Sequence, residues 1–221
     1  MGGRADRLGP WWRLGLAVLG PLLHRAFRIR IVGRERIPEQ GPAILAANHV
    51  SALDGILLAL IAAERARPIR FLVAAEFFHR PLHGFLLRRF GQIAVRRGEQ
   101  HQAALDEAVE TLRGGALVGI FPEGQVNPDP EAGLARGRTG VARLALAAGA
   151  PVVPLGIWGS QARWPRSGFR FGPPLRTPVA LALGPPLEPA GDPTSRDDLA
   201  AFRDLVMEAI AAQVGRAREL A

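Results

Sequence analysis

Short apolar runs alternate with helical stretches along the sequence, and this alternation limits the fold more than any other feature. The apolar runs have the length of buried strands, and they cover residues 43–47, 69–74, 91–95, 116–121, 151–157 and 179–183. Residues 27–32 alternate apolar and arginine side chains, as a half-exposed strand does. Helical patterns cover residues 53–64, 99–113 and 139–148, and a last helix follows the N-cap Ser195. Residues 76–89 are expected to form a helix, or a helix broken around Pro81. We therefore expect an α/β fold with a mixed, largely parallel central sheet and helices on both faces.

Residues 1–27 form a separate predicted segment, ahead of an α/β domain at 28–221. An apolar run from Leu14 to Leu23 follows the paired Trp11 and Trp12. Ten helical residues rise about 15 Å, whereas a bilayer core requires about 20 residues. We expect a helix that lies in the membrane interface, with tryptophans at headgroup depth and arginines on anionic lipid. The alternative is a helix packed on the domain, and both descriptions can hold together.

The charge of the chain indicates an anionic partner. The formal net charge is +8, and all 28 basic side chains are arginine. An anionic membrane surface or a phosphorylated substrate fits this charge, while the lack of zinc-finger spacing and of basic-aromatic patterns argues against nucleic acid. The sequence has no cysteine, which excludes disulfides, thiolate nucleophiles and cysteine-ligated metals. The histidines show no metal-ligand spacing, so we expect no metal.

Polar side chains gather where three of the predicted strands end. These clusters are Asn48-His49, Arg96-Arg97 and Glu123-Gly124. In open α/β sheets, ligands bind at the carboxyl ends of the strands. We therefore expect the three clusters to meet in one functional site.

His49 and Asp54 lie at a strand-to-helix junction, where a loop can fold the histidine back onto the acid. His101 and Asp106 have the same spacing, but they fall within a helical pattern that places their side chains roughly 140° apart. Two plainer interpretations of the first pair stay open. Asp54 can cap the backbone at Ser51, since residues 51–54 match a capping box, and His49 can be a buried histidine without a chemical role.

Four stretches, in order and in register, resemble the motifs of the glycerolipid acyltransferase family, the 1-acylglycerol-3-phosphate acyltransferases. They are Asn48-His49-x-Ser51-x-x-Asp54, Gly91-x-Ile93-x-Val95-x-Arg97, Phe121-Pro122-Glu123-Gly124 and Val153-Pro154-Leu155. The resemblance covers about residues 28 to 190. It implies transfer of a fatty acyl group from an acyl thioester, either acyl-CoA or acyl-carrier protein, to the hydroxyl of lysophosphatidate or a related lysophospholipid. Such an enzyme serves phospholipid biosynthesis and uses the thioester as a co-substrate, with no cofactor.

The resemblance also implies roles for individual residues. His49 acts as general base on the acceptor hydroxyl, and Asp54 holds the imidazole as the acid of a serine-type triad does. Backbone amides at the start of the helix after Asn48 are expected to face the oxyanion. The substrate-binding residues implied are Asn48, Ser51, Arg97, Glu123, Gly124 and Arg138.

The sequence departs from the family pattern in the acceptor-binding region. Gln125-Val126-Asn127 replaces a frequent Thr-Arg-Ser, Arg96 replaces a common aspartate and Arg138 replaces a lysine. The acceptor, the acyl chain length, the thioester donor and the oligomeric state therefore stay open. We expect the protein at the cytoplasmic face of the cell membrane, as a peripheral or monotopic protein.

Two other functions remain in consideration. One is a serine-type lipid hydrolase or thioesterase with Ser51 as nucleophile, although no G-x-S-x-G pattern surrounds Ser51 or Ser160. The other is a basic membrane-surface or nucleic-acid-binding module without catalysis.

Overall fold

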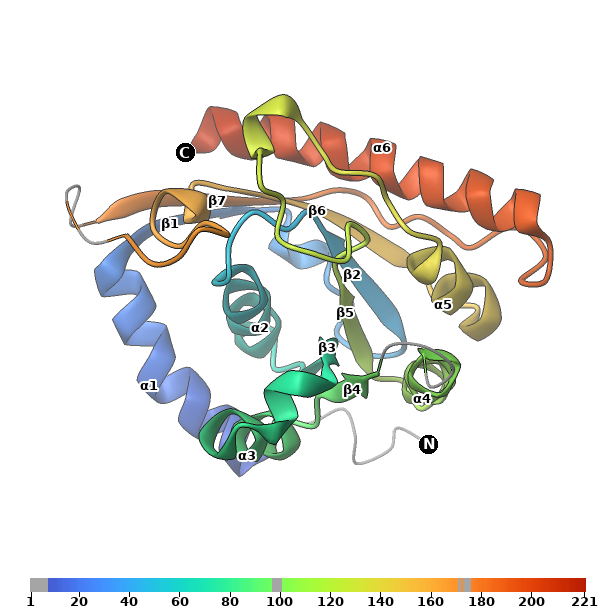
Figure 1. Cartoon of the computed structure of the whole chain (residues 1–221), viewed down its shortest axis with the longest axis horizontal. Helices are drawn as coiled ribbons and strands as arrows, with labels where there is room; N and C mark the ends of the chain where they lie inside the picture. The colour runs from blue at the N-terminus through green and yellow to red at the C-terminus, as the bar shows by residue number, and fades with distance from the viewer. Residues whose placement is uncertain (1–7, 97–100, 171, 173–175) are drawn as a thin grey trace.

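The computed structural model of the chain describes residues 8–96, 101–170, 172 and 176–221, and Figure 1 shows its layers. The strands are β1 (Phe27–Val32), β2 (Ala43–Ala47), β3 (Ile69–Ala74), β4 (Ile93–Val95), β5 (Leu117–Ile120), β6 (Val152–Trp158) and β7 (Thr177–Leu183). The α-helices are α1 (Pro10–Ala26), α2 (Asp54–Glu64), α3 (Pro81–Arg89), α4 (His101–Arg113), α5 (Gly140–Ala148) and α6 (Arg196–Leu220). Short 3-10 turns include η3 (Ala75–His79), η4 (Pro130–Ala132) and η5 (Ser160–Ala162).

Within the described residues, seven strands form one sheet in the order β1-β7-β6-β2-β5-β3-β4. The pairings from β6 to β4 are parallel, whereas β6 and β7 pair antiparallel. β2 and β5 are neighbours, but the helices that follow them, α2 and α5, cover opposite faces of the sheet. Their carboxyl ends therefore flank the crevice in which α/β sheets bind ligands.

The residues of β2 show why this strand lies at the centre of the fold. Ala43, Leu45 and Ala47 pack into the cluster that contains α2, while Ile44 and Ala46 pack into the cluster that contains α4, α5 and α6. All five side chains are fully buried. A strand covered on both faces has to be apolar throughout, so the predicted α/β sheet with helices on both faces is confirmed.

Helix α1 packs on the sheet domain through one of its faces. Leu23 lies in the core, and Trp12 and Leu16 pack against the same cluster as α2. On the outer face, Val18 and Leu22 are 50% and 57% exposed. The packed helix expected as the alternative is thus present, and it also presents apolar side chains outward. No helix in the described residues has the length and apolarity needed to cross a bilayer.

The helix predicted over 76–89 divides into two pieces at Arg80. The 3-10 turn η3 ends at His79, and α3 begins at Pro81. Proline is favoured at the first position of a helix and disfavoured in its interior, which explains the break. At the other end of the chain, the Ser195 hydroxyl accepts a hydrogen bond from the Asp198 N–H, so the predicted N-cap of α6 is confirmed.

Candidate active site

Asp54 is the first residue of α2, and its carboxylate organises the loop that follows β2. Its Oδ2 accepts hydrogen bonds from the N–H groups of Val50 and Ser51, each at 2.7 Å. The same oxygen lies 3.0 Å from Nδ1 of His49. Asp54 therefore both caps the backbone and pairs with the histidine, so the two interpretations of this residue are compatible.

The second carboxylate oxygen of Asp54 binds a side chain from a distant part of the chain. Asp54 Oδ1 accepts a hydrogen bond of 2.7 Å from the hydroxyl of Ser160, which lies just beyond β6. Both residues are 0% exposed. A buried carboxylate is stable only when its oxygens have hydrogen-bond donors, and this one has donors on each oxygen.

The imidazole of His49 is held in one orientation. Its ring stacks on Phe121 at a centroid distance of 4.1 Å and an interplanar angle of 16°. The contact with Asp54 places the ring proton on Nδ1, since a carboxylate can only accept. The opposite nitrogen, Nε2, then carries a lone pair, and the side chain is 19% exposed. This arrangement is able to take a proton from a bound group.

Glu123 holds the backbone on both sides of the crevice. Its Oε1 accepts the N–H of His49 at 2.7 Å, and its Oε2 accepts the N–H of Ala135 at 2.8 Å. Glu123 is 3% exposed, and burial raises its pKa above the ordinary value. Since each oxygen binds a backbone amide, Glu123 positions the backbone on both sides of the crevice, and its contact with substrate stays a prediction.

Asn48 and Ser51 also support the loop from within. The Asn48 amide donates to the carbonyl of Ile157 at 3.0 Å and accepts from its N–H at 2.7 Å, which ties the end of β2 to β6. The Ser51 hydroxyl accepts the N–H of Leu53 at 3.1 Å. Both side chains are buried. The two side chains therefore support the loop from inside the protein. Since the Ser51 hydroxyl is buried and bound to Leu53, this geometry does not support a nucleophilic role for Ser51.

The expectation that amides at this helix start face an oxyanion is wrong. The N–H groups of Val50 and Ser51 bind Asp54. That of Ala52 donates to the carbonyl of Trp164 at 3.2 Å, and that of Leu53 binds the Ser51 hydroxyl. The physical reason is the capping carboxylate, which turns the donors inward. Stabilisation of a developing oxyanion has to come from other groups.

An arginine-lined pocket opens beside Glu123. It has a volume of about 470 Å³ and includes Arg136, Arg138 and Arg203 in its lining. Arg138 is exposed and lies against Gly124, where an added Cβ would come within 2.8 Å of its Nε. Gly124 also has a φ of +71°, which favours glycine. The structure thus brings Gly124 and Arg138 together, whereas Arg97 lies outside the described residues.

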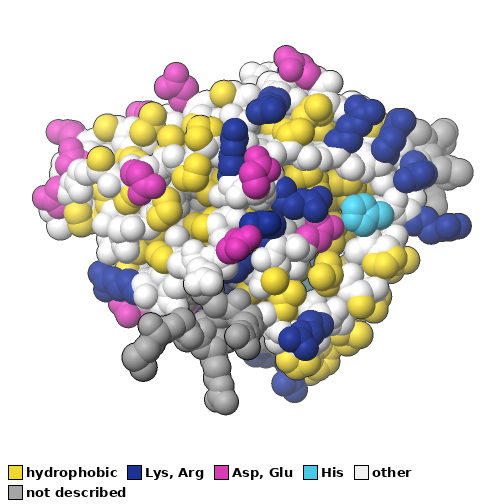
Figure 2. Space-filling view, turned by 180° about the vertical axis from the view of Figure 1, so that it is seen from behind, with side chains coloured by type: hydrophobic (Ala, Val, Ile, Leu, Met, Phe, Trp, Pro, Cys, Tyr) yellow, Lys and Arg dark blue, Asp and Glu magenta, His cyan; other side chains and the backbone are white. Residues whose placement is uncertain are grey.

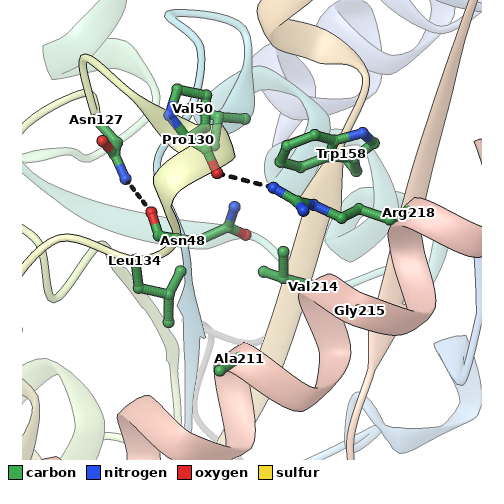
Figure 3. Close-up of a pocket in the computed structure, with 11 residues that line it drawn as sticks. Asn48, Val50, Asn127, Pro130, Leu134, Trp158, Ala211, Val214, Gly215 and Arg218 are labelled. Atoms are coloured by element: carbon green, nitrogen blue, oxygen red, sulfur yellow. Dashed lines mark hydrogen bonds between the residues drawn. The ribbon is translucent and has the colours of Figure 1, made fainter.

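A second cavity of about 220 Å³ lies between the loop after β5, at residues 127–134, and helix α6. Figure 3 shows Arg218 of α6 beside Trp158, with its hydrogen bond to the Pro130 carbonyl. The guanidinium lies 3.8 Å from the Trp158 ring centroid, and the hydrogen bond is 2.9 Å long. Asn48 and Val50 line the cavity from the sheet side. Arg218 therefore fastens the tip of the loop to the end of α6.

The sequence assigned no site role to three residues that the structure places at the site. Asn127 donates its N–H to the His49 carbonyl at 2.6 Å, Phe121 stacks on the imidazole, and Ser160 binds Asp54. Ser160 and Asn127 follow the ends of predicted strands. For Ser160, the signal is a polar side chain just beyond the end of a strand, whereas Asn127 lies further along the loop after β5.

The His49–Asp54 pair thus lies at the carboxyl end of β2, in the region where α/β sheets bind ligands, and Glu123 links its loop to the arginine-lined pocket. The Acyltransferase family model matches residues 28–158 of this chain. The chain belongs to this family of acyltransferases, and the resemblance to glycerolipid acyltransferases is confirmed.

Similar proteins carry two kinds of lipid acyltransferase name. A lyso-ornithine lipid O-acyltransferase of Pseudomonas aeruginosa is 34% identical over 69% of this chain and 54% of its own length. A 1-acyl-sn-glycerol-3-phosphate acyltransferase of the same organism is 30% identical, with 75% and 61% covered. An uncharacterized protein of Mycobacterium leprae is 30% identical, with 63% and 38% covered. The chain therefore matches less than two thirds of the length of these curated relatives.

The fold is also similar to a solved structure. The crystal structure of the 1-acyl-sn-glycerophosphate acyltransferase PlsC from Thermotoga maritima has a TM-score of 0.75 against this chain. The similarity covers 94% of this chain and 79% of that one, at 25% sequence identity. The mixed seven-stranded sheet and its covering helices are thus a known architecture for a lipid acyltransferase.

Proposed function

We propose that the protein transfers a fatty acyl group from an acyl thioester to the hydroxyl of a lysophospholipid, with His49 as general base. The observation that carries this proposal is the 3.0 Å contact between His49 Nδ1 and the buried Asp54 carboxylate. It leaves Nε2 free to accept a proton from a bound hydroxyl, as a general base must.

In the proposed reaction, His49 and Asp54 account for every proton transfer. Nε2 of His49 takes the proton of the acceptor hydroxyl while the oxygen attacks the thioester carbonyl. Asp54 stabilises the imidazolium that forms, as an acid does in a triad. The tetrahedral intermediate then expels the thiolate, which takes the proton back from His49. The product is an ester and a free thiol, and the substrate hydroxyl replaces an enzyme nucleophile.

The arginine-lined pocket supports an anionic acceptor. Arg136 and Arg138 are exposed at its wall, next to the loop that holds the His49 backbone. A guanidinium binds a phosphate or carboxylate through two parallel hydrogen bonds. Lysophosphatidate is the first acceptor to test, and a lyso-ornithine lipid is the second, because relatives are named for both.

An apolar surface on α1 and α3 supports action at a membrane. Leu14, Val18 and Leu22 are exposed along α1, and Leu82 and Phe85 are exposed on α3. The two helices meet where Trp11 packs edge-to-face on Phe85. Seen from behind, hydrophobic side chains gather at this edge with arginines beside them (Figure 2). Such a surface fits the interface of an anionic bilayer, which would supply the lysolipid.

Thiol release from palmitoyl-CoA, with and without lysophosphatidate, tests the reaction in the wild type and in His49→Ala. We expect release that requires both the acceptor and His49. Release without an acceptor indicates a thioesterase and contradicts the proposal. If lysophosphatidate fails, the same assay with a lyso-ornithine lipid and with an acyl-carrier-protein donor identifies the substrate pair, and failure of all combinations rejects the function.

Sedimentation with vesicles tests the membrane surface. We expect the wild type to bind vesicles that contain phosphatidylglycerol and the Val18→Asp/Leu22→Asp variant to stay in solution. Leu205→Asp is the matched control, since Leu205 is also exposed, at 47%, but lies on α6. Equal binding by all three proteins would contradict the assignment of the α1–α3 surface.

A further inference from the structure

Among the hydrogen bonds of the described residues, Ser160 is the one partner of the Asp54 side chain that lies outside the loop after β2. Its hydroxyl donates to Asp54 Oδ1 at 2.7 Å, across 106 positions of sequence. The other oxygen, Oδ2, is the one that pairs with His49. The carboxylate is therefore held on both oxygens: Oδ2 contacts His49 and the N–H groups of Val50 and Ser51, whereas Ser160 is the donor to Oδ1.

The backbone before Ser160 is built to bring this hydroxyl under Asp54. Gly159 has a φ of +95°, and an added Cβ would lie 2.2 Å from the carbonyl oxygen of Pro178. Only glycine permits this turn at the end of β6. The segment at residues 157–164 also binds the His49 loop (residues 48–54) at two more points. Ile157 bonds with Asn48, and Trp164 bonds with Ala52.

We propose that Ser160 is a positioning residue for acyl transfer, acting through Asp54 on His49. This inference rests on the proposed function of the pair. The hydroxyl fixes the rotation of the Asp54 carboxylate, so that Oδ2 stays aligned with the His49 Nδ1–H. Without it, Oδ1 is a buried acceptor with no donor, and only the Val50 and Ser51 amides on Oδ2 still hold the carboxylate, which can rotate about that oxygen and lose its alignment with the ring. His49 then loses both its orientation and the partner that stabilises its protonated form.

Steady-state kinetics of three variants test this role. Ser160→Ala removes the donor, Ser160→Thr retains a hydroxyl, and Ser167→Ala is the control on the exposed part of the same segment. We expect Ser160→Ala to lower kcat about tenfold or more with KM for both substrates within about twofold, which is the size of a lost hydrogen bond to a charged group. We expect Ser160→Thr to recover most of kcat and Ser167→Ala to match the wild type.

A residue that only fills the core gives a different pattern. In that case Ser160→Ala lowers the melting temperature without a selective change in kcat, or Ser160→Thr fails to rescue a variant that is folded by circular dichroism. Either result would overturn the proposal. Wild-type kcat in Ser160→Ala would overturn it as well.

Proton NMR separates this inference from the identity of the substrates. The Nδ1–H of His49 is assigned by its absence in His49→Ala, and it reports the hydrogen bond to Asp54 without any acyl transfer. We expect the signal to shift or to exchange faster with water in Ser160→Ala and to stay unchanged in Ser167→Ala. An unchanged signal in Ser160→Ala rejects the role of Ser160, whereas absence of turnover in the wild type rejects the proposed function alone.

Discussion

The His49 loop at residues 48–54 and the loop at 124–139 both border the crevice, but they differ in how their polar groups are bound. In the first, the Asp54 carboxylate and the N–H groups from His49 to Leu53 have partners inside the protein. In the second, the guanidinium of Arg138 is exposed, and the structure shows no hydrogen bond or ion pair for it within the residues it describes. The backbone of the second loop is also bound, at Asn127, Ala135 and Arg138, so the difference lies in the exposed Arg138 side chain.

This difference separates reaction from recognition. Groups that hold a base must not move as charge develops, and burial in a hydrogen-bonded frame achieves this. Groups that bind a substrate must give up water when the substrate arrives, so they start exposed. The names of the relatives show the same division, since they share acyl transfer and differ in the lysolipid.

The largest effect on turnover is expected from a change in the His49 loop. His49→Ala should lower kcat by about 10² to 10⁴, because a positioned base contributes that much to a proton transfer. The melting temperature should stay close to that of the wild type, because the ring is partly exposed and the loop retains the bonds of Asp54 to Val50 and Ser51. Wild-type turnover in this variant would refute the assignment of the base.

A change at Glu123 should affect both loops at once. Glu123→Gln replaces one acceptor oxygen by an amide that cannot accept the N–H of His49 or Ala135. We expect a loss of about 1 to 3 kcal/mol in the free energy of unfolding, the cost of a buried donor left without a partner. Urea denaturation measures it, and Glu107→Gln at an exposed position of α4 is the control.

The pH dependence of that loss has a defined sign. Since burial raises the pKa of Glu123 above 4.5, the folded protein retains this proton to higher pH than the unfolded chain. The contribution of Glu123 is thus complete below pH 4.5 and declines as the pH rises through the raised pKa. The difference in stability between the wild type and Glu123→Gln should shrink from pH 4 to pH 7. A difference that grows over this range would contradict the cause assigned to the shift.

Removal of an arginine from the loop at 124–139 should affect binding more than chemistry. We expect Arg138→Ala to raise KM for an anionic lysolipid about tenfold or more, the size of a lost hydrogen bond to a charged group, and to change kcat little. Arg143→Ala removes the same charge from an exposed position on α5 and should leave KM unchanged. A fall in kcat at constant KM would show that Arg138 acts in the chemical step, and it would contradict a role limited to substrate binding.

The smallest effect is expected where α6 fastens the loop tip. Arg218→Met removes the stacking on Trp158, the bond to Pro130 and the exposed ion pair with Glu131 from a side chain that is 37% exposed. A partly exposed cation–π contact contributes about 0.5 to 1 kcal/mol. Urea denaturation should show a loss of that size, with KM unchanged. A loss of unfolding free energy as large as that of Glu123→Gln would show that the loop tip at Pro130 contributes as much to stability as the contacts of Glu123 with the His49 loop.

Much of the fold follows from local patterns in the sequence. The apolar runs at 43–47 and 69–74 match β2 and β3 residue for residue, and the Ser195 cap starts α6 as expected. Local patterns succeed here because side-chain periodicity reports which face of an element is buried. They are less informative at Arg67, a charged residue that is 1% exposed because its guanidinium binds backbone carbonyls that include those of Pro38 and Gly115.

The sequence by itself determined the α/β class, the junction that holds His49 and Asp54, and the clustering of polar side chains at strand ends. Only the tertiary structure decided what those side chains do. It turned Glu123 toward backbone amides, and it placed Ser160 on Asp54 from 106 positions away. The reason is that spacing encodes contacts within one or two turns of chain, while the partners of a buried charge come from whichever strands the sheet order brings together.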